Sequence, residues 1–494
     1  MRYGEKNAAT SVPPAVVSAL MRVALPGRLA QPDGPAGLAA SILVGTTLGL
    51  SLLAGWGVTH RGHLTWMAVQ AVLLFAIVVI YLSLGPDRLF VGWLFFGPFF
   101  QSYARFNRIG WILSSIVYVL PLAIMALQML GSNNLARRLR WYDALPFAYL
   151  TLVLLSQAVV GASALLSFHF YVSLVYGGIL VGVPLYYFCA FGPLGRLSAS
   201  GVAAALLSSS SIVGAMAIAE HYTSWNLWGQ HYGDHPPRVV STLAQPAVLG
   251  AFLGAGIMVA TAALVWDGPP KLRRLSLATL AATVPALYFT YTRGPILATF
   301  AAAALLVVAR PRMRLIAAGV TAVAALLIAL SWGPISSSSV YRARGPGETV
   351  NVRTRLVISE ASLHLAAQRP ILGWGYGKFD TVKNSESFNT GNLPTKQLYD
   401  YTSHDTYLTI LVELGAAGLV LVLLPWIIVT RLTLRASRWT PTSKWFSLAL
   451  LGVLSVVALT ALTTDMRFFS FVPALCWIAV GLLRRRLWDP RTLA

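Results

Sequence analysis

Runs of about 20 apolar residues recur along almost the whole chain, and no other feature constrains the fold as strongly. Each run is long enough to cross the hydrocarbon core of a bilayer as one helix. Backbone polar groups find no water there, so such runs predict helices, whose hydrogen bonds are internal. We expect about fourteen spans, near residues 39–58, 65–84, 89–104, 111–130, 144–165, 168–190, 200–219, 244–265, 275–291, 294–309, 315–331, 406–430, 445–463 and 468–483.

The composition agrees with a membrane protein. Charged residues make up 11% of the 494 and hydrophobic residues 56%, whereas soluble domains carry about 25% charged residues. We therefore predict an all-α polytopic integral membrane protein with about 12–14 transmembrane helices. The formal net charge is +21. The arginines that contribute most of it lie between hydrophobic runs, which favours membrane lipid over nucleic acid as a partner. Cys189 and Cys476 fall inside apolar runs and support neither disulfides nor a cysteine metal site.

The distribution of cations predicts the orientation. With the N-terminus in the cytoplasm, 23 of the 37 Lys and Arg residues fall on the cytoplasmic face and 14 on the other. Eight of those 14 lie in the longest connection, residues 332–405, and long loops cross membranes largely regardless of charge. We therefore expect both termini in the cytoplasm and this connection on the outer face, which is the periplasm for a bacterial inner membrane.

Three polar segments fall on this outer face, each at the end of an apolar run. They are Arg238–Pro246, the tight turn Tyr291–Pro295, and the long connection, which carries Arg355, Gly373–Phe379 and His404. Arginines at the outer ends of apolar helices suit an anionic group that arrives within the bilayer. A lipid-linked diphosphate is such a group, because guanidinium offers bidentate donors to phosphate oxygens without a metal.

Each arginine taken alone also fits a simpler interpretation, as an orientation or snorkelling residue. Arg293 fits it less well, because it lies on the face with few cations, in a turn too short to need a solubilising charge. Arg238 is a similar but weaker case. Gly373–Gly377 resembles a phosphate-binding loop only in its glycine content. No strand is predicted before it, and no Lys-Ser or Lys-Thr follows it. We interpret it as a tight turn and keep Lys378 as an accessory phosphate contact.

His404 is the candidate base, because imidazole with its reference pKa of ~6.5 accepts a proton near neutral pH. All eight histidines fall on the outer face, so location alone does not distinguish it. His221, His231 and His235 could be drawn as a metal cluster, but their spacing favours a loop without metal. Glu413 is the one clearly intramembrane charge and a candidate partner for an outer-face arginine.

The order and spacing of these segments resemble a known family. His404–Leu408 and Val412–Leu419 resemble the His-Asn-x-Tyr-Leu and Val-Glu-x-Gly-x-x-Gly-Leu signature of the O-antigen ligase and polymerase superfamily. Tyr291–Pro295 resembles its Ser/Thr-Arg-Gly motif, and Arg238–Pro246 its Arg-x-x-Gly-Thr-Phe-x-x-Pro-Asn loop. Pro370–Phe379 resembles its Pro-x-x-Gly-x-Gly-x-Gly-x-Phe turn. The resemblance covers roughly residues 220–430 of the chain.

The resemblance implies a metal-independent, inverting glycosyltransferase of the GT-C type, without a cofactor, that uses an undecaprenyl-diphosphate-linked glycan as donor. Arg238 and Arg293 would hold the diphosphate and stabilise its charge as it leaves. His404 would activate the acceptor hydroxyl. The weaker candidates for contacts with diphosphate or acceptor are Arg355, Lys378, Asp405, Tyr407 and Tyr291.

Three positions depart from the family pattern. Ser241 stands where the family prefers Gly, Ala247 replaces the usual Asn, and Asp405 replaces Asn. The change at Ala247 argues against a polar role at that site. Asp405 could orient or charge His404 in a way that an amide could not.

Several activities stay open within and beyond this family. We favour an O-antigen ligase with lipid A core as acceptor. A histidine before the Tyr-Leu motif resembles the pattern of ligases and protein transferases more than that of many polymerases. The number of spans argues instead for an O-antigen or exopolysaccharide polymerase that extends a growing glycan. A protein O-oligosaccharyltransferase is a further alternative. A transporter or flippase for lipid-linked glycan is a different class, but we detect no internal repeat of the kind that transporters commonly show.

The segments together predict four regions of the chain. They are a cytoplasmic tail at 1–38, an N-terminal transmembrane bundle at 39–219, a catalytic region at 220–430 that includes the periplasmic loop 332–405 with its short helices, and C-terminal transmembrane helices with a cytoplasmic tail at 431–494.

Overall fold

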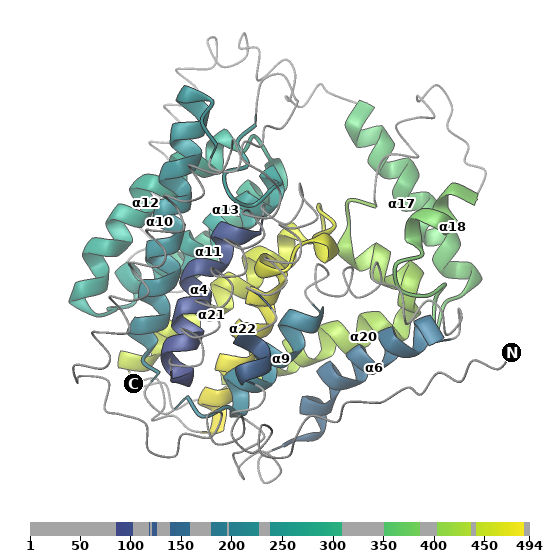
Figure 1. The fold of residues 1–494 in the computed structure, drawn as a ribbon, viewed down its shortest axis with the longest axis horizontal. Helices are drawn as coiled ribbons and strands as arrows, with labels where there is room; N and C mark the ends of the chain where they lie inside the picture. The colour runs from purple at the N-terminus through teal and green to yellow at the C-terminus, as the bar shows by residue number, and fades with distance from the viewer. Residues whose placement is uncertain are drawn as a thin grey trace, which may run out of the picture. The chain divides into compact units, whose positions relative to one another are not determined.

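The computed structural model describes ten parts of the chain, all helical or connecting. They are residues 85–101, 118, 121–125, 139–158, 179–194, 197–226, 238–308, 350–385, 403–435 and 441–488. The chain divides into two units, Met1–Gly85 and Pro86–Ala494. Every helix described below belongs to the second unit (Figure 1).

The helices follow the predicted spans closely. In chain order the elements are α4 (Pro86–Phe100), η2 (Trp141–Ala144), α6 (Leu145–Ala158), α9 (Ile179–Phe191), α10 (Ala199–Thr223), α11 (Pro246–Val265), α12 (Pro270–Phe289), α13 (Arg293–Val308), α17 (Val350–Gln368), α18 (Phe379–Ser385), α20 (Thr406–Arg435), α21 (Pro441–Thr460), η4 (Met466–Phe468) and α22 (Phe471–Trp488). The predicted spans 39–58, 65–84 and 315–331, and most of 111–130, lie outside the described residues.

Three of the described helices are long and apolar enough to cross a membrane, namely α10, α11 and α20. Shorter apolar helices occur at Val181–Phe191, Arg293–Val307 and Lys444–Thr460. The all-helical fold expected from the sequence is thus confirmed for the described residues, with three helices that could span a membrane. The total of about 12–14 spans stays a prediction.

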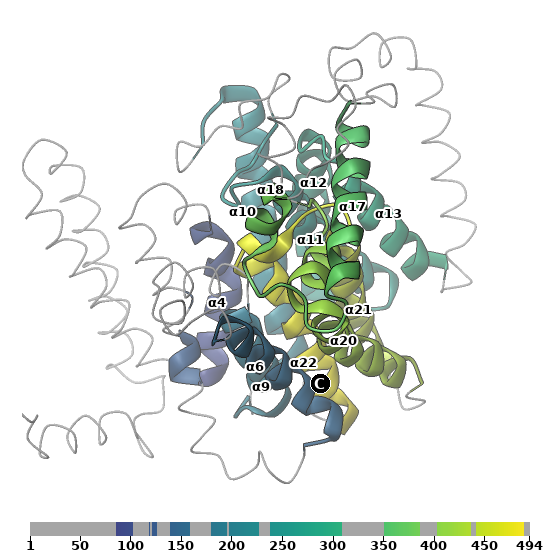
Figure 2. The same ribbon diagram turned by 90° about the vertical axis from the view of Figure 1, so that its right-hand side faces the viewer.

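Helix α11 forms the centre of the packing and contacts α10, α12, α13 and α21. Its glycines allow this close approach, as in other membrane helices where small residues line the contacts. A side chain at Gly254 would collide with Thr299 on α13, and one at Gly256 with Ser210 on α10. On another side of the unit, which faces the viewer in Figure 2, α17 and α18 pack on α20.

The helix ends that the cation count assigns to one face are in contact with each other. On the predicted outer face, the Gln101 side chain donates to the Leu243 carbonyl at 3.4 Å and accepts from the Phe471 N–H at 3.1 Å. On the predicted cytoplasmic face, Arg484 donates to both oxygens of buried Asp143 at 2.9 Å. The packing therefore agrees with the predicted alternation of the spans.

Helix α20 is broken, whereas the sequence predicts one continuous span from 406 to 430. Gly415 has φ +65° and ψ −167°, a conformation that is open to glycine and interrupts the helix. The N–H groups of Ala416 and Ala417 donate instead to the carbonyls of Pro370 and Ile371, at 2.8 and 3.1 Å. The break thus positions the turn that follows α17 against the middle of α20.

Candidate active site

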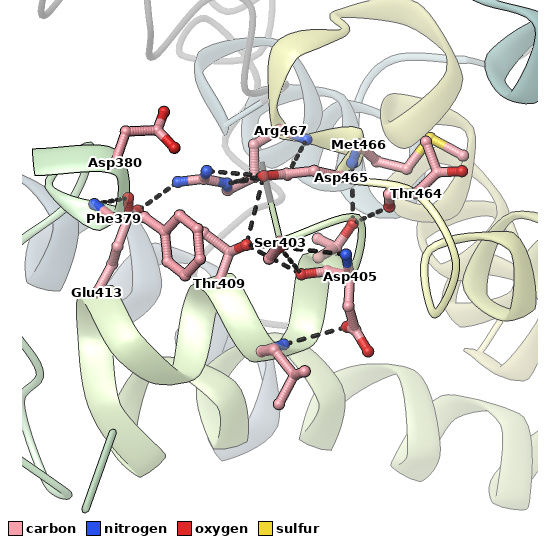
Figure 3. Close-up of polar contacts among 12 residues, drawn as sticks. Phe379, Asp380, Ser403, Asp405, Thr409, Glu413, Thr464, Asp465, Met466 and Arg467 are labelled. Atoms are coloured by element: carbon pink, nitrogen blue, oxygen red, sulfur yellow. Dashed lines mark hydrogen bonds and ion pairs between the residues drawn. The ribbon is translucent and has the colours of Figure 1, made fainter. Parts of the chain in front are cut away.

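Three charged side chains form a buried cluster beside α20 (Figure 3). Glu413 on α20 is 1% exposed, and its Oε2 lies 2.6 Å from Nη1 of Arg467, which is 8% exposed. The same guanidinium donates to Asp465 Oδ2 at 2.7 Å. The expected pairing of Glu413 with an outer-face arginine is confirmed. Its partner lies in the connection between α21 and α22, outside every motif that the sequence singled out.

This triad of Glu413, Arg467 and Asp465 anchors two other segments. Glu413 Oε1 accepts from the N–H of Phe379, the first residue of α18, at 3.0 Å. Asp465 Oδ2 accepts from Thr409 Oγ1 at 3.3 Å, and Thr409 in turn contacts the hydroxyl of Ser403. The triad therefore holds both α18 and the turn that carries His404.

Removing the cation of the triad is expected to destabilise the protein. Arg467→Leu leaves two buried carboxylates without a counter-charge, a change that costs about 3–5 kcal/mol in other buried ion pairs. Denaturant unfolding of the purified protein in detergent measures this free energy. The double variant Arg467→Leu with Glu413→Leu should recover part of the loss. An Arg467→Leu protein as stable as the wild type would contradict the structural role of the triad.

The turn at His404 is fixed by the residues on either side of it. His404 has φ +52°, a left-handed conformation that is uncommon outside glycine but that Asn, Asp and His adopt more often than other residues. Asp405 caps α20, because its Oδ1 accepts from the N–H groups of Tyr407 at 2.8 Å and Leu408 at 3.1 Å. Asn and Asp are about equally good caps, which explains how Asp405 stands where the family has Asn. Burial raises the pKa of Asp405 above its ordinary value, and the two N–H donors oppose that shift.

The rest of the His404–Leu408 motif attaches α20 to the neighbouring helices. The hydroxyl of Thr406 donates to the Thr464 carbonyl at 2.8 Å, and its N–H donates to the Ala461 carbonyl at 2.9 Å. The hydroxyl of Tyr407 donates to the Ala458 carbonyl at 2.8 Å. In the described structure Tyr407 therefore has a packing role beside its predicted contact with substrate.

The Gly373–Gly377 run is a turn that docks on the break of α20. The N–H groups of Trp374 and Gly375 donate to the Val412 and Glu413 carbonyls at 2.9 and 2.7 Å. A side chain at Gly373 would collide with the Glu413 backbone. These N–H groups are used within the protein, so the interpretation as a tight turn is confirmed. The glycine-rich motif and the Val-Glu-x-Gly motif are two halves of one contact.

The loop that carries Arg238 is shaped by a carboxylate. Glu220, at the end of α10, accepts from the Ser241 N–H at 2.7 Å and from the Val240 N–H at 3.3 Å. Ser241 has φ +47°, which explains why glycine is preferred at this position. The Val239 N–H donates to the Phe289 carbonyl at 3.4 Å, so the loop lies beside the end of α12.

Arg293 begins α13, and its side chain is exposed. The next residue, Gly294, packs directly on Thr463, in the connection that also carries Asp465 and Arg467. A helix N-terminus attracts anions through its N–H groups and dipole, which adds to the charge of Arg293. Tyr291 precedes it with φ +46°, and burial raises its pKa.

Charged side chains from four different segments act electrostatically on His404. Burial lowers the pKa of its imidazole to about 4, and Arg355 on α17 acts in the same direction. Arg238 and Lys383 also lower this pKa, whereas Asp465 raises it. The structure therefore brings together three of the predicted residues, His404, Arg238 and Arg355. A neutral imidazole is the form that accepts a proton.

Lys383 also acts on His404, although no sequence motif singled it out. Lys383 lies in α18, is 1% exposed, and has its Nζ 3.5 Å from Asp380 Oδ1. Lys378 is half-buried in the preceding turn. Lys383 comes one helical turn after the motif residue Phe379, and this spacing is the signal that could have found it.

The three histidines that could be drawn as a metal cluster are only partly described. His221 stacks on Phe289 with ring centroids 3.9 Å apart and an interplanar angle of 7°. His231 and His235 lie outside the described residues.

Comparison with known proteins supports the resemblance drawn from the motifs. The family described as O-antigen ligase matches residues 275–423, a stretch that includes Arg293, Arg355, Lys383, His404 and Glu413. No curated protein sequence matches the chain. Residues 275–423 thus match the O-antigen ligase and polymerase superfamily, in agreement with the motifs.

Proposed function

We propose that the chain is an O-antigen ligase of the bacterial inner membrane. It transfers a glycan from an undecaprenyl-diphosphate-linked donor to a hydroxyl of lipid A core, on the periplasmic face, as an inverting GT-C-type enzyme without a metal. The observation that carries this proposal is the position of His404 among Arg238, Arg355 and Lys383. The cations suit the diphosphate of the donor, and the neutral imidazole is the form that can accept the proton of the acceptor hydroxyl.

Each group has one task in the proposed reaction. His404 takes the proton of the acceptor hydroxyl while its oxygen forms a bond to the anomeric carbon from the face opposite the diphosphate. The bond from that carbon to the diphosphate oxygen breaks, and its electron pair leaves with undecaprenyl diphosphate. Arg238, Arg293 and the N-terminus of α13 stabilise the charge that develops on this leaving group.

The charges around His404 predict an unusual pH profile. A base must be neutral, and imidazole is neutral above its pKa, so kcat/KM should fall only as the pH drops through about 4. Arg355→Ala removes a cation that disfavours imidazolium, so the acid limb should move to higher pH. Arg353→Ala, another exposed arginine two residues away on α17, is the matched control. An acid limb near the reference value of ~6.5 that neither variant moves would contradict this charge environment.

A transporter is the alternative from a different class, and the broken helix α20 invites it, because transporters bind substrates at such breaks. Here the N–H groups of Ala416 and Ala417 donate to the turn at Pro370–Ile371. The break is thus used for packing, which favours the enzyme.

The acceptor decides between the activities of this superfamily. Proteoliposomes with the purified protein and a synthetic lipid-linked glycan can be offered lipid A core, further donor, or a peptide containing Ser and Thr. Glycan on lipid A core supports the ligase, and the control is the same mixture without acceptor. Products that lengthen in the donor alone would identify a polymerase, and a glycopeptide would identify a protein transferase.

A further inference from the structure

The connection between α21 and α22, residues 461–470, contacts two parts of the candidate active site. It lies beyond residues 275–423, which match the family, and beyond the motifs found in the sequence. On one side it holds the turn that carries His404. On the other side it touches the start of α13, where Arg293 lies. The proposed base and the proposed leaving-group site are thus joined through one short segment.

The start of α20 is fixed on this connection by three hydrogen bonds of Thr406. Its N–H donates to the Ala461 carbonyl at 2.9 Å, and its hydroxyl donates to the Thr464 carbonyl at 2.8 Å. The same hydroxyl accepts from the Met466 N–H at 2.9 Å. Thr406 lies two residues after His404, so a shift of the turn relative to the connection would cost these bonds.

A carboxylate of the connection begins a short chain of hydroxyl groups beside the turn (Figure 3). The ionised side chain of Asp465 can only accept, and its Oδ2 takes the single hydroxyl proton of Thr409 at 3.3 Å. Thr409 then accepts from Ser403 and cannot donate to it. Ser403 Oγ accepts in turn from the Asp405 N–H at 3.1 Å. The chain therefore runs from Asp465 to the peptide group that joins His404 to Asp405.

Asp465 is itself held in one orientation. Arg467 donates to Oδ1 through Nε at 2.9 Å and to Oδ2 through Nη2 at 2.7 Å, which is a bidentate pair. The Arg467 N–H adds a third bond, to Oδ1 at 3.1 Å. Asp465 is 4% exposed. A buried carboxylate fixed by three donors is suited to orient the groups that bond to it.

The second contact of the connection lies at the start of α13. A side chain at Gly294 would collide with Thr463, so the Gly294 backbone packs directly on that threonine. Thr463 is fixed in turn, because its hydroxyl donates to the Thr460 carbonyl at 3.1 Å. Packed contacts of this kind transmit displacements. The position of Arg293, next to Gly294, therefore depends on the connection.

We propose that this connection sets the distance between the base and the leaving-group site, with Asp465 as the positioning residue for His404 and Thr463 as the positioning residue for Arg293. The inference rests on the proposed function, because it uses the roles given there to His404 and Arg293. Inverting attack requires the hydroxyl and the leaving group on opposite faces of one carbon. A misplacement of about 1 Å can therefore cost on the order of 10²-fold in rate.

Thr409→Val tests the side of the base, because valine lacks the hydroxyl that links Asp465 to the turn. Turnover per folded molecule should fall about tenfold. The affinity for the lipid-linked glycan should stay unchanged, since the arginines are untouched. Thr409→Ser restores the hydroxyl and should recover most of the loss. Thr433→Val is the matched control and should behave as the wild type, because buried Thr433 on α20 donates within its own helix, to the Val429 carbonyl at 2.7 Å.

Thr463→Ala tests the side of the leaving group, because it removes the side chain on which Gly294 packs. Turnover per folded molecule should again fall. The matched control is Ser455→Ala on α21, whose hydroxyl donates within its own helix, to the Leu451 carbonyl at 2.8 Å. It should leave turnover unchanged.

A double-mutant cycle of Thr409→Val and Thr463→Ala measures the coupling between the two sides. Losses from independent sites multiply. Here the double variant should lose less than the product, by about twofold or more, because one displaced connection has already misplaced both groups. Losses that multiply would contradict a single shared segment.

The outcomes separate this inference from the proposed function. The folded fraction of each variant is measured by size-exclusion chromatography and circular dichroism. Wild-type turnover per folded molecule in both Thr409→Val and Thr463→Ala would overturn the positioning role and leave the glycosyltransferase intact. An equal loss in Thr409→Ser and Thr409→Val would likewise overturn the role of the hydroxyl chain. No transfer by the wild type would contradict the proposed function itself.

Discussion

His404→Ala is expected to lower the turnover number of glycan transfer by about 10²–10⁴-fold, the usual contribution of a positioned general base. His404 lies among Arg238, Arg355 and Lys383, and burial with these cations keeps its imidazole neutral near pH 7. In its absence the acceptor hydroxyl must lose its proton to water. The measurement is single-turnover transfer from a lipid-linked glycan to lipid A core.

Two further variants make this result interpretable. His404→Asn keeps a side chain that tolerates φ +52°, so it separates loss of the base from strain in the turn. It should be as inactive as His404→Ala. His364→Ala removes an exposed histidine on α17 and should retain full activity. Normal transfer by both His404 variants would remove the general-base role.

Arg293→Ala should lower turnover by about 10²–10³-fold, the loss typical of one group that stabilises a developing negative charge. The fold should be retained, because Arg293 is an exposed residue at the start of α13. Arg293→Lys should recover only part of the activity, since an ammonium lacks the planar fork that binds phosphate oxygens bidentately. Arg238→Ala should act in the same direction.

The control for nonspecific loss of positive charge is Arg273→Ala. Arg273 lies near the start of α12, is 48% exposed, and pairs with Asp267 at 3.7 Å. Its removal should leave transfer unchanged. Equal activity of Arg293→Ala and Arg273→Ala would show that Arg293 is an orientation residue, the simpler interpretation given to it by the sequence.

Hydropathy alone predicted most of the described helices, because each predicted helix is a separate apolar run. The polar helices α17 and α18 are not such runs. Residues 244–265 were predicted as a span, and α11 covers Pro246–Val265. The break at Gly415 was missed because the apolar run continues through it. Its cause is the turn at Pro370–Gly375, about 40 residues earlier, which bonds to the opened backbone. No local pattern carries such a long-range contact.

The candidate site divides in the same way. The motif residues His404, Arg238 and Arg355 were found by their order along the chain, and the structure brings their charges together. Arg467 was missed because pairing of buried charges is a property of the packed protein. Lys383 was missed because only its spacing from Phe379 indicated it. The cap at Asp405 could have been predicted, since Asp just before an apolar helix is a usual N-cap.

Release of undecaprenyl diphosphate tests the central claim most directly. Purified wild-type protein in proteoliposomes, given a synthetic lipid-linked glycan and lipid A core without nucleotide and with EDTA, should release one undecaprenyl diphosphate for each new glycosidic bond. His404→Ala should bind the same donor and release almost none. Donor that binds to the wild type and remains intact in the presence of acceptor would contradict a glycosyltransferase.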